Sequence, residues 1–132
     1  MRAYFLLPVL GLLPACAQEG GYAHAYKMES LQDGVGGPKA LAQPGDFILE
    51  NDRIRLAILD ARPSMGPHTS GASLVDADLQ RNDPRYSQGR GVDQLAEVFP
   101  TVNLNVAQAD TVMDPVEGEG TVRILSDGSR GG

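Results

Sequence analysis

The feature that most constrains this chain is an alternation of residue types between positions 47 and 59. In the segment 53–59, branched apolar residues alternate with charged or small ones. The shorter segment 47–50 precedes it, and Asn51-Asp52 between the two is typical of a turn. A period of two is the period of a β-strand, so the pattern predicts a β-hairpin with one wet face. We expect three residues to face a core and two to face water: Ile54, Leu56 and Ile58 inward, Arg53 and Arg55 outward.

The rest of the chain repeats short strand patterns between loops rich in Gly, Pro and Ser. Strands are predicted over 73–79, 101–106 and 120–125, with loops over 60–71, 80–91 and 107–118. Residues 92–99 fit a helical turn or a strand equally well. Short strands at this spacing without long helices predict a mainly β fold: a partial antiparallel β-sandwich after a signal peptide and a flexible tether.

The domain organisation follows from this pattern. Residues 1–15 are predicted to be a signal peptide, residues 16–45 a tether and irregular lead-in, and residues 46–132 a β-rich domain. The segment 126–132 resembles a hairpin turn with no strand after it, which leads us to expect a domain truncated at its C-terminus. The alternative is a frayed, glycine-rich tail.

The net charge of the chain indicates which classes of partner to expect. The chain has 11 Lys and Arg against 17 Asp and Glu, giving a net charge of −6. Nucleic-acid binding requires a basic patch, and no such patch is visible, so no nucleic-acid partner is expected. No cofactor motif is present either, and no cofactor is predicted. The Gly-rich run at 34–39 lacks the lysine and hydroxyl spacing of a P-loop.

The N-terminus predicts export. Residues 3–13 form an apolar run that is too short to span a bilayer, as in a signal peptide. The chain has one cysteine, Cys16, directly after this run. The segment Leu13-Pro14-Ala15-Cys16 resembles the lipobox of bacterial lipoproteins, although Pro14 stands where that family has a small residue. The resemblance implies lipidation of Cys16, the membrane as partner, and a cell-envelope location at the outer membrane or cell surface.

A second interpretation of the same segment stays open. Ala15-Cys16-Ala17 also fits an ordinary signal-cleavage site. Cleavage after Ala17 would remove Cys16, and the protein would then be secreted or periplasmic.

Residues 35–130 carry a further resemblance. Gly45-Asp46, Glu50-Asn51-Asp52, Arg55 and Ser73-Leu74-Val75-Asp76 resemble a pattern in the N-terminal region of large exported proteins of predatory soil bacteria. The resemblance implies a β-rich module that precedes further domains. The hairpin and the strand after it are also loosely similar to the opening of the mutarotase-like super-sandwich of sugar epimerases. That likeness carries over no catalytic residue.

Three aspartates are weak candidates for a metal site: Asp76, Asp78 and Asp83. Calcium prefers several oxygen ligands in a flexible loop, but the spacing fails the EF-hand pattern. A wet strand face explains Asp76 and Asp78 better than a calcium site does, and there they could pair with Arg53 and Arg55 across neighbouring strands.

The remaining reactive side chains form no catalytic pattern. His24 and His68 lie far apart and lack zinc-ligand spacing. Ser70 and Ser73 lie close to His68, but the nucleophile elbow G-x-S-x-G is missing. No catalytic residue is therefore assigned, and whether the chain is an enzyme stays open.

Two hypotheses for function follow. The first is a non-catalytic exported β module that acts as a scaffold or binding domain. The second is the N-terminal part of a larger secreted enzyme, one that could act on carbohydrate.

Overall fold

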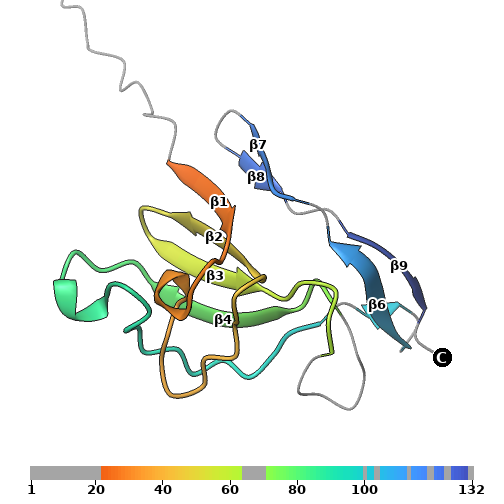
Figure 1. Cartoon of the computed structure of the whole chain (residues 1–132), viewed down its shortest axis with the longest axis horizontal. Coiled ribbons are helices and arrows are strands. Elements are labelled where there is room, and N and C mark those ends of the chain that lie inside the picture. Colours follow the sequence, from red (N-terminus) through yellow and green to blue (C-terminus); the bar gives the residue numbers. More distant parts are fainter. Residues whose placement is uncertain are drawn as a thin grey trace, which may run out of the picture.

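The fold comes from a computed structural model, shown in Figure 1. It describes residues 22–63, 71–99, 101–102, 105–112, 114–118, 121–123 and 126–130. The fold is mainly β, as the sequence predicted, and its sheets are antiparallel.

The central element is a four-stranded antiparallel sheet in the order β1-β2-β3-β4. Its strands are β1 Ala23–Lys27, β2 Phe47–Asn51, β3 Ile54–Ile58 and β4 Leu74–Leu79. Strands β2 and β3 form the predicted hairpin, which is confirmed. Its turn is fixed by the Asn51 side chain, whose Oδ1 accepts hydrogen bonds from the backbone N–H groups of Arg53 and Ile54.

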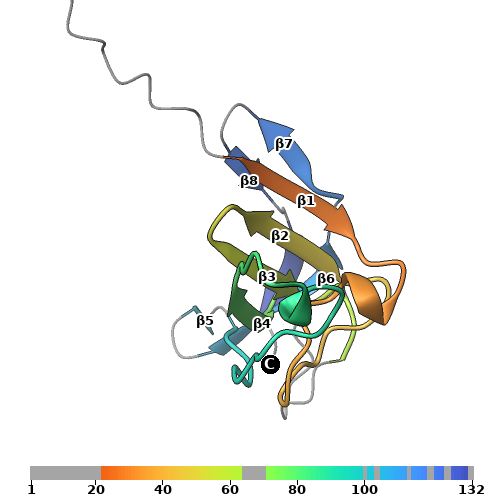
Figure 2. The ribbon, with the colours of Figure 1, turned by 90° about the vertical axis from the view of Figure 1, so that its left-hand side faces the viewer.

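The C-terminal part forms two smaller sheets. Strand β6 (Asn105–Val112) lies between β5 (Thr101–Val102) and β9 (Ser126–Arg130), while β7 (Val116–Gly118) pairs with β8 (Thr121–Arg123). Figure 1 shows β6 and β9 beside the four-stranded sheet. Figure 2 shows β7 and β8 alongside β1, which they contact.

Several C-terminal predictions were wrong. The predicted loop over 107–118 holds most of β6 and all of β7, and the predicted turn over 126–132 contains strand β9. Strand β9 has little strand propensity of its own, since it reads Ser-Asp-Gly-Ser-Arg. It forms because it pairs with β6, a long-range contact that local pattern does not reveal.

The structure describes residues 22–45 of the predicted tether and irregular lead-in over 16–45, and these residues differ from that prediction. Residues 23–27 form β1, which pairs along its whole length with β2. A 3₁₀-helix (η1, Leu31–Asp33) follows. Beyond β1, Met28 and Val35 are buried in the core. These residues are therefore part of the folded domain.

Each face of the sheet packs on a separate apolar cluster. The larger cluster joins Ile48 and Ala57 of the sheet to residues of the segment after β1, and comprises Met28, Val35, Ile48, Ala57, Leu59 and Val75. The smaller cluster joins Phe47 to Ala109 and Val112 of β6, with Ile58 against it. Strand β6 therefore forms a second layer over the Phe47 face.

The predicted orientation of β3 holds only in part. Ile58 packs against the Phe47 cluster, but Ile54 is 38% exposed and the most buried residue of the strand is Ala57, at 0%. Ala57 lies on the same face as Arg55. That face is buried because loops before β2 and after β4 fold over it, which the alternation of residues cannot indicate.

The loop after β4 contains a second 3₁₀-helix (η2, Pro84–Tyr86), capped by the Asp83 side chain. Residues 92–99 form neither a helix nor a strand. An isolated β-bridge joins Val98 of this segment to Leu74 of β4. Both predicted alternatives for this segment were wrong.

Candidate functional site

Buried aspartates hold the loops that cover the Ala57 face. Asp76, on β4, is 0% exposed. Its Oδ1 accepts the Leu41 N–H at 2.7 Å and its Oδ2 accepts the Ala42 N–H at 3.0 Å. The pKa of Asp76 is raised above its ordinary value, mainly because burial disfavours the charged carboxylate. The nearby charges of Asp93 and Asp46 also raise it, whereas the two N–H donors lower it. Asp76 thus fixes the end of the loop before β2.

Asp93 plays the corresponding part for the loop after β4. It is 1% exposed, and its Oδ1 accepts N–H groups from Ala77 at 2.8 Å and Leu95 at 3.1 Å. Farther along, Val98 exchanges two backbone hydrogen bonds with Leu74, at 2.8 and 2.9 Å. The loop is therefore attached to β4 through both Asp93 and Val98.

The two loops also bind each other directly through their backbones. The Gly91 N–H donates to the Val35 carbonyl at 2.9 Å, and the Lys39 N–H donates to the Asp93 carbonyl at 3.3 Å. Gly36 lies between these contacts with a φ of 74°, and a Cβ there would lie 1.7 Å from the Gly89 carbonyl oxygen. The Gly-rich run thus has a structural use, because only glycine fits this approach.

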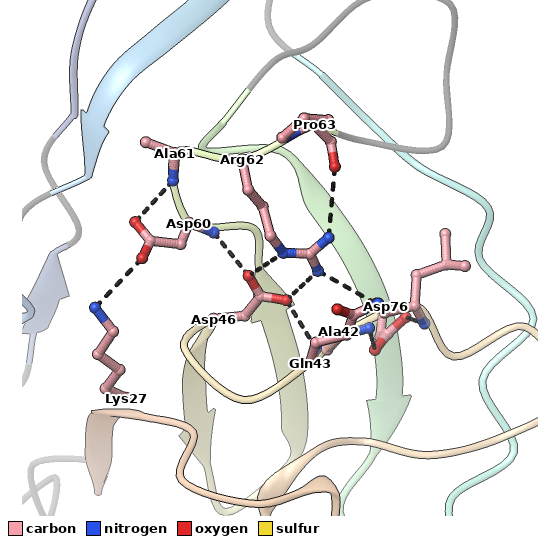
Figure 3. Close-up of polar contacts among 10 residues, drawn as sticks. Lys27, Ala42, Gln43, Asp46, Asp60, Ala61, Arg62, Pro63 and Asp76 are labelled. Atoms are coloured by element: carbon pink, nitrogen blue, oxygen red, sulfur yellow. Dashed lines mark hydrogen bonds and ion pairs between the residues drawn. The ribbon is translucent and has the colours of Figure 1, made fainter.

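A third buried aspartate, Asp46, joins the loop before β2 to the segment after β3 (Figure 3). It is 0% exposed and accepts N–H groups from Gln43 at 2.8 Å and Asp60 at 2.9 Å. The Arg62 guanidinium binds both of its oxygens, at 3.0 and 2.5 Å. A bidentate pair of this kind is a strong, directional contact.

These contacts shape a pocket between the two loops, with a volume of about 540 Å³. One loop contributes residues 38–41 and the other residues 96, 97 and 99. The lining is mostly apolar: Pro38, Lys39, Ala40, Leu41, Ala96, Glu97 and Phe99. A smaller cavity of about 240 Å³ shares Ala40 and Leu41 with it.

Two charged side chains line this pocket, and they differ in their surroundings. Lys39 is exposed, whereas Glu97 is partly buried. The Glu97 Oε1 atom is buried and has no hydrogen-bond partner. Lys39 and Glu97 form no ion pair with each other. The pocket therefore combines an apolar lining with a carboxyl group that can accept a hydrogen bond or bind a cation.

The three candidate metal ligands have separate partners. Asp76 binds backbone N–H groups, while Asp78 is held by Arg81 at 2.6 and 2.7 Å and by the Val92 N–H at 2.8 Å. Asp83 accepts from its neighbour Arg85. In the described part of the chain, no group of three or more His, Cys, Asp or Glu side chains could hold a metal ion.

The prediction that Arg55 pairs with an aspartate on the neighbouring strand was wrong. Arg55 does lie opposite Asp78 in the sheet register. Its guanidinium instead binds Glu50 at 2.7 Å and the Tyr26 hydroxyl at 2.9 Å. Arg53 is exposed, as expected.

His24 and Ser73, the described members of the other reactive side chains named from the sequence, do not line the pocket. His24, on β1, lies between the rings of Tyr22 and Tyr26, with ring centroids 6.2 and 5.3 Å away. Ser73 is buried at 0% exposure. Cys16, His68 and Ser70 lie outside the described residues.

Sequence reasoning missed the residues that build the pocket. Gly45-Asp46 before a strand was a detectable sign of a turn, but Asp93 and Glu97 lie in a segment without regular structure. Their roles depend on contacts with Ala77 and with the opposite loop, which no local pattern reports.

Comparisons with known proteins found no protein-family model, curated protein or solved structure that matches this chain. Among the described residues, no helix has both the length and the apolar character needed to cross a membrane.

Proposed function

We propose that this chain is a lipid-anchored protein of the bacterial cell envelope whose β module binds a small ligand between two loops. The observation that carries the binding role is the pocket of about 540 Å³ with its apolar lining. Pockets for small ligands commonly measure about 300–1,000 Å³ and combine apolar walls with a few polar groups. The proposed anchor is Cys16, by the resemblance of Leu13–Cys16 to a lipobox.

The groups behind the pocket support a binding module rather than a catalytic one. Asp76 and Asp93 are buried carboxyl groups, and both accept backbone N–H groups of the loops that line the pocket. Such contacts fix the loops and so reduce the entropy lost when a ligand binds. The sheet then serves as a rigid support for two binding loops.

The binding role can be tested by NMR with the full chain labelled with ¹⁵N. A library of small apolar amines, alcohols and acids should shift the amide signals of residues 39–41 and 96–99. The variant Ala96→Trp fills the pocket and should abolish these shifts, whereas the exposed control Arg53→Trp should retain them. Shifts that spread over the whole surface, or that survive in Ala96→Trp, would refute the pocket as a binding site.

The anchor is tested separately in cells. Metabolic labelling with a radioactive fatty acid should mark the wild-type protein and leave Cys16→Ser unlabelled. Cys16 is the chain's single cysteine, so the comparison isolates one thiol. A mature N-terminus at Gln18 would show ordinary cleavage and a released protein.

A further inference from the structure

The Glu97 carboxyl group points to the kind of ligand that the pocket takes. Its Oε1 atom is buried without a hydrogen-bond partner, although the side chain is only partly buried and lines the pocket. One oxygen of this carboxylate is therefore removed from water without a donor, which is unfavourable. The strongest partner for a carboxylate is a positively charged N–H donor.

Lys39 does not supply that partner. It lines the same pocket, but it forms no ion pair with Glu97, and its side chain is exposed. Water and salt screen an exposed charge more than a partly buried one. Of the two charged side chains that line the pocket, Glu97 is therefore the less screened. The net charge of −6 also favours the approach of cations over anions.

The remaining lining specifies the body of the ligand. Leu41, Ala96 and Phe99 present apolar surface, and Phe99 is 40% exposed. An aromatic or branched aliphatic group would cover this surface and remove it from water. The ligand should therefore join one cationic head to one compact apolar body.

We propose that the pocket binds a primary organic ammonium with an aromatic or branched apolar body. The ammonium group donates to the Glu97 carboxylate, and the apolar body packs against Leu41, Ala96 and Phe99. The remaining ammonium protons stay hydrated at the open side. This inference rests on the proposed binding function and adds the chemical class of the ligand.

The test compares four probes that share a phenyl body and differ in the head group. These are phenethylammonium, 2-phenylethanol, 3-phenylpropionate and zwitterionic phenylalanine, each titrated into the ¹⁵N-labelled full chain. Phenethylammonium should bind about tenfold more tightly than 2-phenylethanol, as expected when a charge-assisted hydrogen bond replaces a neutral one. 3-Phenylpropionate should bind most weakly.

Two variants assign the preference to its residue. Glu97→Gln keeps the shape of the side chain and removes its charge, so phenethylammonium should lose about tenfold in affinity while 2-phenylethanol changes less than about twofold. Lys39→Met removes a competing cation and should strengthen phenethylammonium binding. Far-UV circular dichroism and a thermal melt confirm that each variant is folded.

The outcomes separate the ligand class from the binding function. If all four probes bind equally at residues 38–41 and 96–99, or if Glu97→Gln leaves their order unchanged, the ammonium class is wrong while the binding site stands. If 3-phenylpropionate or phenylalanine binds best and Lys39→Met abolishes that binding, the pocket selects a carboxylate instead. If no probe shifts these residues, the ammonium proposal is overturned. Library shifts that persist in Ala96→Trp refute the pocket itself.

Discussion

Replacing Asp46 with alanine tests whether buried carboxylates hold the loops in place. The wild-type carboxylate is 0% exposed and accepts two backbone N–H groups, from Gln43 and Asp60, besides the bidentate contact with Arg62. In Asp46→Ala both N–H groups lose this acceptor, while Arg62 keeps its contacts with the Leu41 and Pro63 carbonyls. The two N–H groups belong to different segments, so the attachment of the loop before β2 to the segment after β3 would weaken.

The expected loss follows from these contacts. Each backbone N–H left without its partner costs about 1–3 kcal/mol. The Arg62 side chain is 30% exposed, so water can replace part of its lost contact. Removing the buried charge also recovers its desolvation penalty. Together these effects predict that the free energy of unfolding falls by about 3 kcal/mol, a large share of the 5–15 kcal/mol typical of a domain.

The measurement is urea unfolding at pH 7, followed by far-UV circular dichroism because the chain contains no tryptophan. With an m-value of about 2 kcal/mol/M, the midpoint should fall by about 1.5 M. Asp52→Ala, at an exposed position, should change stability by less than about 0.5 kcal/mol. Arg62→Met should be clearly less destabilising in the Asp46→Ala background than in the wild type. A loss below about 1 kcal/mol for Asp46→Ala, or additive effects with Arg62→Met, would refute this account.

Two further predictions concern pH and the loop contact. The Arg81 guanidinium, aided by backbone N–H groups, lowers the pKa of Asp78 to about 2 from its ordinary value of 3.8. Its stabilising contribution should therefore be present above about pH 4 and be lost as the pH falls through 2, and Arg81→Met should raise the Asp78 pKa in a ¹³C NMR titration. Gly36→Ala should destabilise by about 3 kcal/mol or more, since φ is 74° and the new Cβ would meet the Gly89 carbonyl at 1.7 Å. Gly45→Ala, with a φ of 103° and no atom within 4 Å, should cost about 1–2 kcal/mol, from backbone strain alone. Equal losses in these two glycine variants would show that the contact between the loops contributes nothing.

The sequence by itself determined the strands that carry a strong local signal. Alternating residues and an Asn-Asp turn predicted the β2–β3 hairpin, and the run over 73–79 predicted β4. These elements are encoded locally, because a period of two and a turn residue act within a few positions. The mainly β fold class followed from the same signals.

Only the tertiary structure decided the rest of the fold and the candidate site. Strand β9 exists through its pairing with β6, and β1 through its pairing with β2. The face of β3 that carries Arg55 is buried because two loops fold over it, so alternation identified the two faces but not which one packs more deeply. The pocket depends on Asp76 and Asp93 capturing N–H groups from other segments, up to 35 positions away. Such contacts are set by chain packing, and no short stretch of residues contains both partners.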